Sequence, residues 1–350
     1  MKSILIYIPL AILLMWFLTV EGMNLSYDST HYLVAGDFFS HGKLKQGLNK
    51  IFPHHAPFYS LVLASTQLLT GGAIEGKDRH PVKKFIVRNV PWARLVAIFG
   101  FTLTVMGMFL LGWHFGGSVT AHLSAGLTLI FSPLVNIFTW AWSETLFLPI
   151  SIFCLLALFL YTKKRSIFWL LFSAVLAGLA FFTRFIGISL ILTGSLVVLF
   201  VIENPKQLVR IIPWNLIACS PVLLYLGIHR VTAPNPHGFF YHLLEFSKVS
   251  LRDFAPIAVL VMVLGLILEV LRWKDGEKVR IWWGVVLYVL MYSGILLIIC
   301  SSIWIDPLDS HFSRLNMPIY PFLLLFVSVA LTGLYKTPER PFTETYHYEG

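Results

Sequence analysis

Charged residues are scarce in this chain. Only 12% of its 350 residues are Asp, Glu, Lys or Arg, whereas 57% are hydrophobic and the mean hydropathy is +0.78. A soluble domain carries charge on about a quarter of its residues. Apolar runs of about 20 residues, long enough to cross a bilayer as a helix, recur from one end of the chain to the other. The composition excludes a soluble globular protein and predicts an all-α, polytopic integral membrane protein.

Cysteines are few, and common cofactor motifs are missing. The three cysteines, Cys154, Cys219 and Cys300, lie inside apolar segments, at a spacing that suits neither a disulfide framework nor a metal site. We interpret them as small core residues. No group of His, Cys, Asp and Glu has metal-ligand spacing, and there is no glycine-rich phosphate loop. No cofactor is therefore expected, although dependence on a divalent metal stays open.

The net charge of +9 could suggest a nucleic-acid partner. Here, however, Lys and Arg gather in short loops beside apolar runs, so we attribute the excess to membrane topology and predict no nucleic-acid partner. The positive-inside rule makes the side of these loops cytoplasmic, together with both chain termini. The basic residues of these loops are Lys163, Lys164, Arg165, Lys206, Arg210, Arg272, Lys274, Lys278, Arg280, Lys336 and Arg340.

The hydrophobic pattern predicts about ten membrane spans. Residues 1–22 look like a signal peptide, but the apolar run 4–20 is long for one and no small-x-small cleavage site follows, so we interpret it as a retained first helix. A single transmembrane unit covers residues 1–335, and a short polar cytoplasmic tail covers 336–350. The predicted spans are 4–20, 93–112, 119–139, 144–161, 167–183, 186–202, 211–228, 256–272, 281–303 and 316–335.

The apolar segment 57–70 is too short to be a further span. As a helix it would measure about 21 Å, against about 30 Å for the hydrocarbon core. If it crossed, every later basic loop would change sides. We therefore predict an interfacial or re-entrant helix within one long external loop, residues 21–92.

Two kinds of residue mark the predicted helix ends. Tryptophans are typical of an aromatic belt at the membrane surface. Ionisable residues at the membrane boundary are costly, and they usually face the bundle interior or a wet cavity. A carboxylate there can deprotonate a hydroxyl while arginines neutralise a departing phosphate. The tryptophans are Trp92, Trp113, Trp140, Trp142 and Trp304, and the external ionisable residues are Asp28, Glu144, Arg184, His311 and Arg314.

Each acid also has a structural interpretation. Asp28 could cap a helix that begins near Ser29, and Glu144 could favour a helix start through the macrodipole. Asp37 lies nine residues after Asp28, about 180° around a continuous helix, so the two acids would not share a face. We interpret Asp37 as a solvated or capping residue.

The basic residues have alternatives as well. Arg184 and Arg314 could extend to lipid headgroups. His54 and His55 precede Pro57 and could order the loop instead of taking part in chemistry.

Four short motifs, in this order, resemble the GT-C superfamily of membrane glycosyltransferases, in particular protein O-mannosyltransferases and bacterial aminoarabinose transferases. An acid follows the opening helix, and a His-x-Pro-x-Tyr block lies at the start of the surface helix. A second acid lies at the start of a helix at the external face, and arginines precede two helices. The motifs are Asp28-Ser-Thr-His-Tyr32, His55-Ala-Pro-Phe-Tyr59, Ser143-Glu-Thr-Leu-Phe147, and Thr183-Arg184-Phe-Ile-Gly187 with Arg314, Pro318 and Pro321.

The resemblance implies an inverting transfer of a sugar from a polyprenyl-phosphate carrier to a hydroxyl of an envelope glycan, lipid or protein. Transfer would take place on the external side of a bacterial or archaeal plasma membrane. It implies that Asp28 is the general base and that Glu144 supports the site from a second helix. The same resemblance makes Arg184 and Arg314 hold the lipid phosphate. The remaining substrate-binding residues implied by it are Tyr32, His55, Tyr59 and His311.

Two departures and one rival class qualify this expectation. Ala56 replaces the first proline of the family's Pro-Pro pair, and the lysine that aminoarabinose transferases carry before the proline is absent, which disfavours aminoarabinose as the donor sugar.

The rival is a transporter or a flippase for lipid-linked sugars. It would need ionisable residues at mid-membrane and paired broken helices. Glu269, near the cytoplasmic end of its span, does not supply such a site.

Overall fold

The computed structural model describes residues 2–51, 55–69, 81–201, 209–228, 285–286, 288–293 and 317–334. Within these residues the regular structure is helical, without a strand. The predicted site residues His311 and Arg314, the predicted span 256–272 and the predicted tail lie outside them.

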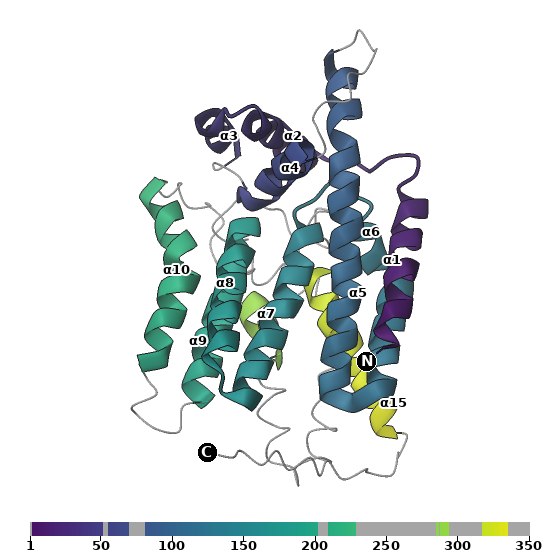
Figure 1. Ribbon diagram of the computed structural model, residues 1–350, viewed down its shortest axis with the longest axis vertical. Coiled ribbons are helices and arrows are strands. Elements are labelled where there is room, and N and C mark those ends of the chain that lie inside the picture. Colours follow the sequence, from purple (N-terminus) through teal and green to yellow (C-terminus); the bar gives the residue numbers. More distant parts are fainter. Residues whose placement is uncertain are drawn as a thin grey trace, which may run out of the picture.

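Apolar helices run side by side as a bundle (Figure 1). Two helical stretches, Asn89–Ile130 and Glu144–Lys164, are long and apolar enough to cross a membrane, and shorter apolar helices pack beside them. The predicted spans 167–183 and 211–228 coincide with two of these shorter helices. The bundle helices are α1 (Ile4–Leu18), α5 (Pro81–Ile130), α7 (Glu144–Lys164), α8 (Ile167–Thr183), α9 (Ile188–Val201), α10 (Ile211–Ile228) and α15 (Tyr320–Leu334).

Helix α5 is in fact two antiparallel arms. Gly117 has φ 82° and ψ −163°, a conformation outside the helical region that glycine adopts without a steric penalty. The arms, residues 81–116 and 118–130, pack closely, because a Cβ on Gly112 would lie 2.8 Å from the Ser124 hydroxyl. The second arm leads into α6 (Ser132–Ile137). The arms and α6 correspond to the two spans predicted at 93–112 and 119–139.

Three helices of the predicted loop lie across one end of the bundle, at the top of Figure 1. They are α2 (Tyr27–Ser40), α3 (Leu44–Ile51) and α4 (Phe58–Leu69), and we call them the α2–α4 layer. Helix α4 lies where the sequence predicts an interfacial or re-entrant helix, at 57–70. The Ser60 hydroxyl of α4 donates to the Tyr32 carbonyl of α2 at 3.0 Å, which fixes these two helices to each other.

A cluster of buried apolar side chains joins the α2–α4 layer to the first arm of α5. It includes Leu33 of α2, Leu63 of α4 and Ala93 and Val96 of α5. Burial of such side chains stabilises by about 1.5–3 kcal/mol each, so the layer is part of the packed fold.

Arg94 of α5 fixes the end of α1 nearest this layer. Its guanidinium donates to the Thr19 hydroxyl at 3.0 Å and to the Trp16 carbonyl at 2.9 Å. The same group lies 4.0 Å from the centroid of the Trp16 ring, within the range of a cation–π contact.

Helices α5 and α7 approach so closely at Gly100 that a Cβ there would overlap the Thr145 carbonyl. We expect Gly100→Ala to lower the free energy of unfolding by about 1–3 kcal/mol, the usual cost of overpacking. The midpoint of thermal unfolding of the purified protein measures this. Gly126→Ala is the matched control, because nothing lies within 4 Å of a Cβ at Gly126. Equal midpoints for the two variants would contradict the close approach.

Candidate active site

The start of α2 is fixed by two serines. Ser26 is the N-cap: its hydroxyl accepts from the Ser29 N–H at 3.3 Å, and the Ser29 hydroxyl accepts from the Ser26 N–H at 3.0 Å. This reciprocal pair satisfies two N–H groups at the helix end. The interpretation of Asp28 as the cap is therefore wrong. Asp28 lies in the first turn of α2.

Residues 139–142, which precede α7, hold the start of α2 in place. The Asn24 N–H donates to the Thr139 carbonyl at 2.9 Å, and the Ala141 N–H donates back to the Asn24 carbonyl at 3.2 Å. The Trp142 indole donates to the Ser26 hydroxyl at 2.7 Å and is 7% exposed. The aromatic-belt interpretation is thus wrong for Trp142, which positions the helix that carries Asp28.

The two acids of α2 have different partners. Asp28 Oδ1 lies 3.6 Å from His55 Nε2, whereas Asp37 Oδ1 lies 3.8 Å from His41 Nδ1, one turn further along α2. Helical phase therefore separates them as predicted, and Asp28 is the acid that faces the other candidate residues.

Aromatic rings surround His55. Its backbone N–H donates to the Ile51 carbonyl at the end of α3, at 2.8 Å. Its ring centroid lies 4.9 Å from that of Tyr32 and 5.7 Å from that of His31. Sequence reasoning did not select His31, although its place three residues after Asp28 puts both on one helix face. His31 is 8% exposed.

Tyr59 completes this group from α4. Its ring centroid lies 5.1 Å from that of Tyr32, with the rings nearly perpendicular. Burial raises the pKa of the Tyr59 hydroxyl well above its usual range, so the group stays protonated at physiological pH.

Ser143, also not selected from the sequence, links the α2–α4 layer to α7. It occupies the N-cap position of α7, but its side chain makes no capping hydrogen bond. Instead, Ser143 Oγ lies 3.0 Å from Tyr32 Oη and donates to Glu144 Oε2 at 3.4 Å. The only sequence signal for this role is that Ser143 directly precedes Glu144.

Glu144 and Arg184 form a buried ion pair. The Glu144 side chain is fully buried and that of Arg184 is 12% exposed. Arg184 follows α8 in extended conformation and precedes a short 3₁₀ turn, Phe185–Gly187. Gly187 lies against the Ala180 backbone, so the chain folds back and directs Arg184 inward. An extension of Arg184 to lipid headgroups is therefore wrong.

These contacts join six residues into one polar network. It runs from Asp28 through His55, Tyr32 and Ser143 to Glu144 and Arg184. These residues come from α2, the segment between α3 and α4, the start of α7 and the end of α8. Exposure falls along it, from 29% for the Asp28 side chain and 16% for His55 to zero for Glu144. Within the ranges that the structure describes, no three His, Cys, Asp or Glu residues are placed to hold a metal ion. The network therefore offers a carboxylate near the surface and a paired cation in the interior.

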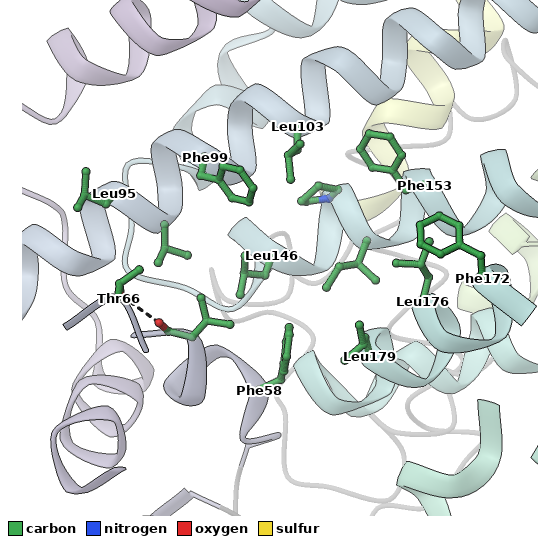
Figure 2. A pocket seen from close by; sticks show the side chains of 14 residues that line it. Phe58, Thr66, Leu95, Phe99, Leu103, Leu146, Phe153, Phe172, Leu176 and Leu179 are labelled. Carbon is green, nitrogen blue, oxygen red and sulfur yellow. Dashed lines mark hydrogen bonds between the residues drawn. The ribbon is translucent and has the colours of Figure 1, made fainter. Parts of the chain in front are cut away.

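A cavity of about 600 Å³ lies between α4, α5, α7 and α8 (Figure 2). Its lining is apolar except for Thr66, whose hydroxyl donates to the Val62 carbonyl at 2.9 Å. Leu95 and Phe99 on its wall are 42% and 60% exposed, so this wall reaches the surface of the bundle. The lining residues are Phe58, Val62, Thr66, Leu95, Val96, Phe99, Leu103, Leu146, Pro149, Ile150, Phe153, Phe172, Leu176 and Leu179.

Two solved structures share this fold, whereas no protein-family model and no curated protein sequence matches the chain. One is ArnT from Cupriavidus metallidurans bound to undecaprenyl phosphate, with a TM-score of 0.57. The other is the same protein in the apo state, with a TM-score of 0.56. Each is 15% identical to the chain, and each match covers 95% of this chain and 60% of ArnT.

ArnT is an aminoarabinose transferase of the GT-C type. The comparison confirms the all-α, polytopic GT-C fold expected from the sequence. The chain spans about 60% of the length of ArnT.

The buried ion pair allows a prediction about the free energy of unfolding. We expect Arg184→Met to lower the free energy of unfolding by about 3–5 kcal/mol, because it leaves the Glu144 carboxylate buried without its cation. Thermal unfolding of the purified protein measures this. The double variant Glu144→Gln with Arg184→Met removes both charges and should recover part of the loss. If the double variant were as unstable as Arg184→Met, the charge of Glu144 would not be the cause.

Proposed function

We propose that the chain is a membrane glycosyltransferase that moves a sugar from a polyprenyl-phosphate carrier to a hydroxyl acceptor. One observation carries the proposal: an acid near the surface and a buried arginine belong to one polar network, and α7, which opens with Glu144 of that network, also lines an apolar cavity. A lipid-phosphate sugar has the same division into a polar head and an apolar chain. The proposal is further supported by the shared fold of ArnT, which was solved with undecaprenyl phosphate.

In the proposed reaction, Asp28 removes the proton of the acceptor hydroxyl, and the oxygen attacks the anomeric carbon of the sugar. The bond from that carbon to the phosphate oxygen breaks, and the electron pair leaves with the phosphate. The guanidinium of Arg184 stabilises the phosphate charge. Attack from the face opposite the phosphate inverts the anomeric centre. Arg314 and His311 are proposed to complete the phosphate and sugar sites from the segment before α15.

Glu144 has a supporting role in this scheme. Its carboxylate is buried and paired with Arg184, so it does not reach an acceptor itself. It keeps Arg184 turned inward, where a phosphate can approach. We propose that Tyr32, His55 and Tyr59 form the wall of the sugar site.

The apolar cavity suits the isoprenoid chain of the carrier. Each methylene that moves from water into such a site contributes about 0.8 kcal/mol, so a long chain can supply much of the binding free energy. Its lining contains no ionisable side chain. A transporter would place ionisable residues in its central pathway, so the cavity favours the transferase over a transporter or flippase.

We also propose that the site faces the extracytoplasmic side of a bacterial or archaeal plasma membrane. Lys163 and Lys164 lie at the opposite end of α7 from Glu144, which opens this helix. By the positive-inside rule the basic end is cytoplasmic, and the α2–α4 layer is then external. Both termini would be cytoplasmic, and the acceptor would be an envelope glycan, a lipid or a protein.

Removal of the proposed base tests the reaction. We expect Asp28→Asn to insert normally and to lower kcat/KM by about 10²–10⁴-fold, the usual contribution of a general base. Purified protein is incubated with an envelope extract, which supplies the acceptor hydroxyls, and with a panel of undecaprenyl-phosphate hexoses and pentoses, and released undecaprenyl phosphate is measured by mass spectrometry. Asp37→Asn, the same change on the same helix, should retain activity. Full activity in Asp28→Asn would exclude it as the base, and no release from any donor would argue against the transferase.

The proposed role of the cavity is tested by the affinity for the lipid carrier. Leu176→Trp should fill part of it and displace about two methylenes, so the Kd for undecaprenyl phosphate should rise about tenfold. Binding of this lipid to the purified protein in detergent is measured by thermal stabilisation. Val175→Trp is the matched control, because Val175 is the neighbouring α8 residue, is 45% exposed and is not part of the lining. Equal Kd values for the two variants would place the isoprenoid chain elsewhere.

A further inference from the structure

The hydrogen bonds of the polar network all point the same way from donor to acceptor, and the ion pair sets this order. Arg184 stays protonated at any accessible pH, so the paired Glu144 carries no hydrogen and only accepts. The Ser143 hydroxyl donates its single hydrogen to Glu144 Oε2. Ser143 Oγ can then only accept from its other neighbour in the network.

That neighbour is Tyr32, whose hydroxyl lies 3.0 Å from Ser143 Oγ. Since Tyr32 also has a single hydrogen, it donates to Ser143 and presents only lone pairs to His55 Nδ1, 3.4 Å away. His55 Nδ1 must therefore be the nitrogen that carries a hydrogen. In a neutral imidazole, the other nitrogen, Nε2, then has none.

His55 Nε2 faces Asp28 Oδ1 at 3.6 Å. In this tautomer both atoms are proton acceptors, and together they have room for one proton. Contacts of 3.4–3.6 Å are long for hydrogen bonds, as is common for catalytic groups without substrate.

The opposite tautomer of His55 is incompatible with this sequence of donors and acceptors. If Nε2 carried the hydrogen, Tyr32 would turn its own hydrogen to Nδ1. The oxygens of Tyr32 and Ser143 would then lie 3.0 Å apart with no hydrogen between them, unless Ser143 stopped donating to Glu144. A buried hydroxyl that loses its hydrogen bond in this way is unfavourable, so this tautomer is disfavoured.

We infer that Glu144, acting through Ser143 and Tyr32, holds His55 as the Nδ1–H tautomer, so that Asp28 and His55 together accept the proton of the attacking hydroxyl. The reaction part of this inference rests on the proposed function. The acceptor O–H bond breaks, its proton comes to lie between Asp28 Oδ1 and His55 Nε2, and the electron pair of that bond forms the new bond to the anomeric carbon. His55 is then a catalytic residue, and Tyr32 and Ser143 are positioning residues.

The surroundings of His55 are consistent with a shared proton. The titratable groups that the structure places against the His55 ring are Asp28, His31 and Tyr32, all from α2. Tyr59 of α4 contacts Tyr32, and Glu144 and Arg184 are connected to Tyr32 through Ser143. Asp28 is therefore the anion in contact with the ring and the group that stabilises a proton on it.

The tautomer can be observed without any substrate. The full chain, with isotope-labelled histidine, is placed in lipid nanodiscs at about pH 8, where an ordinary imidazole is neutral. Nitrogen chemical shifts distinguish the two tautomers, and His55→Gln identifies the His55 signals. We expect Nδ1–H in the native chain and Nε2–H in Tyr32→Phe, since the carboxylate of Asp28 then becomes the better acceptor. Nε2–H in the native chain, or no change in Tyr32→Phe, would overturn the inference.

Two further variants test which residue controls the tautomer of His55. Tyr27→Phe is the matched control, because Tyr27 is 78% exposed, contacts His31 and lies outside the network, so the tautomer should not change. Asp28→Asn should also keep Nδ1–H, because the inference assigns control to Glu144. A change of tautomer in Asp28→Asn would show that Asp28 sets it, which contradicts the inference.

The shared proton is tested by the pH dependence of kcat, with the donor that the release assay identifies. Because Asp28 and His55 share the proton, the acidic limb should move in His55→Gln relative to the native chain. An unmoved limb would remove His55 from the chemistry. Because the tautomer is read without a donor, a correct tautomer combined with no transfer would reject the proposed function alone.

Discussion

The ion pair between Glu144 and Arg184 is the constraint on which the site depends. Two charges in a bundle interior lose their hydration, and the loss is compensated only if the pair stays together with well-placed hydrogen bonds. The start of α7, the turn after α8 and the Ser143 hydroxyl all serve this pairing. Since the ion pair fixes which atoms donate and which accept, its influence extends to the surface of the α2–α4 layer.

Two environments meet along α7. Its start presents Glu144 of the polar network, and its later turns line an apolar cavity that reaches the bundle surface at Leu95 and Phe99. An amphiphilic substrate can satisfy both only if its head and its chain take one orientation. In the proposed reaction, this sorting would position the scissile bond before any specific contact with the sugar is made, which reduces the entropy lost on reaching the transition state.

The sequence predicted the helices better than the contacts between them. Hydropathy located α8 and α10 to the residue, and the apolar segment 57–70 located the short helix α4. Motif order brought Asp28, Glu144 and Arg184 forward as candidates. Ser143 and Trp142 were missed or misread, because their roles depend on partners more than a hundred residues away. A hydroxyl or an indole looks the same in sequence whether it faces lipid or a distant helix.

The bond from Trp142 to Ser26 also has a consequence for the timing of biosynthesis. The chain is synthesised from its N-terminus, and 116 residues separate this donor from its acceptor. Throughout that interval the ribosome has already released the residues of α2, but the segment that fixes their first turn does not yet exist. The candidate site is therefore assembled late, when the loop before α7 emerges. A nascent chain that stops earlier carries Asp28 and His55 without Trp142, Ser143, Glu144 and Arg184.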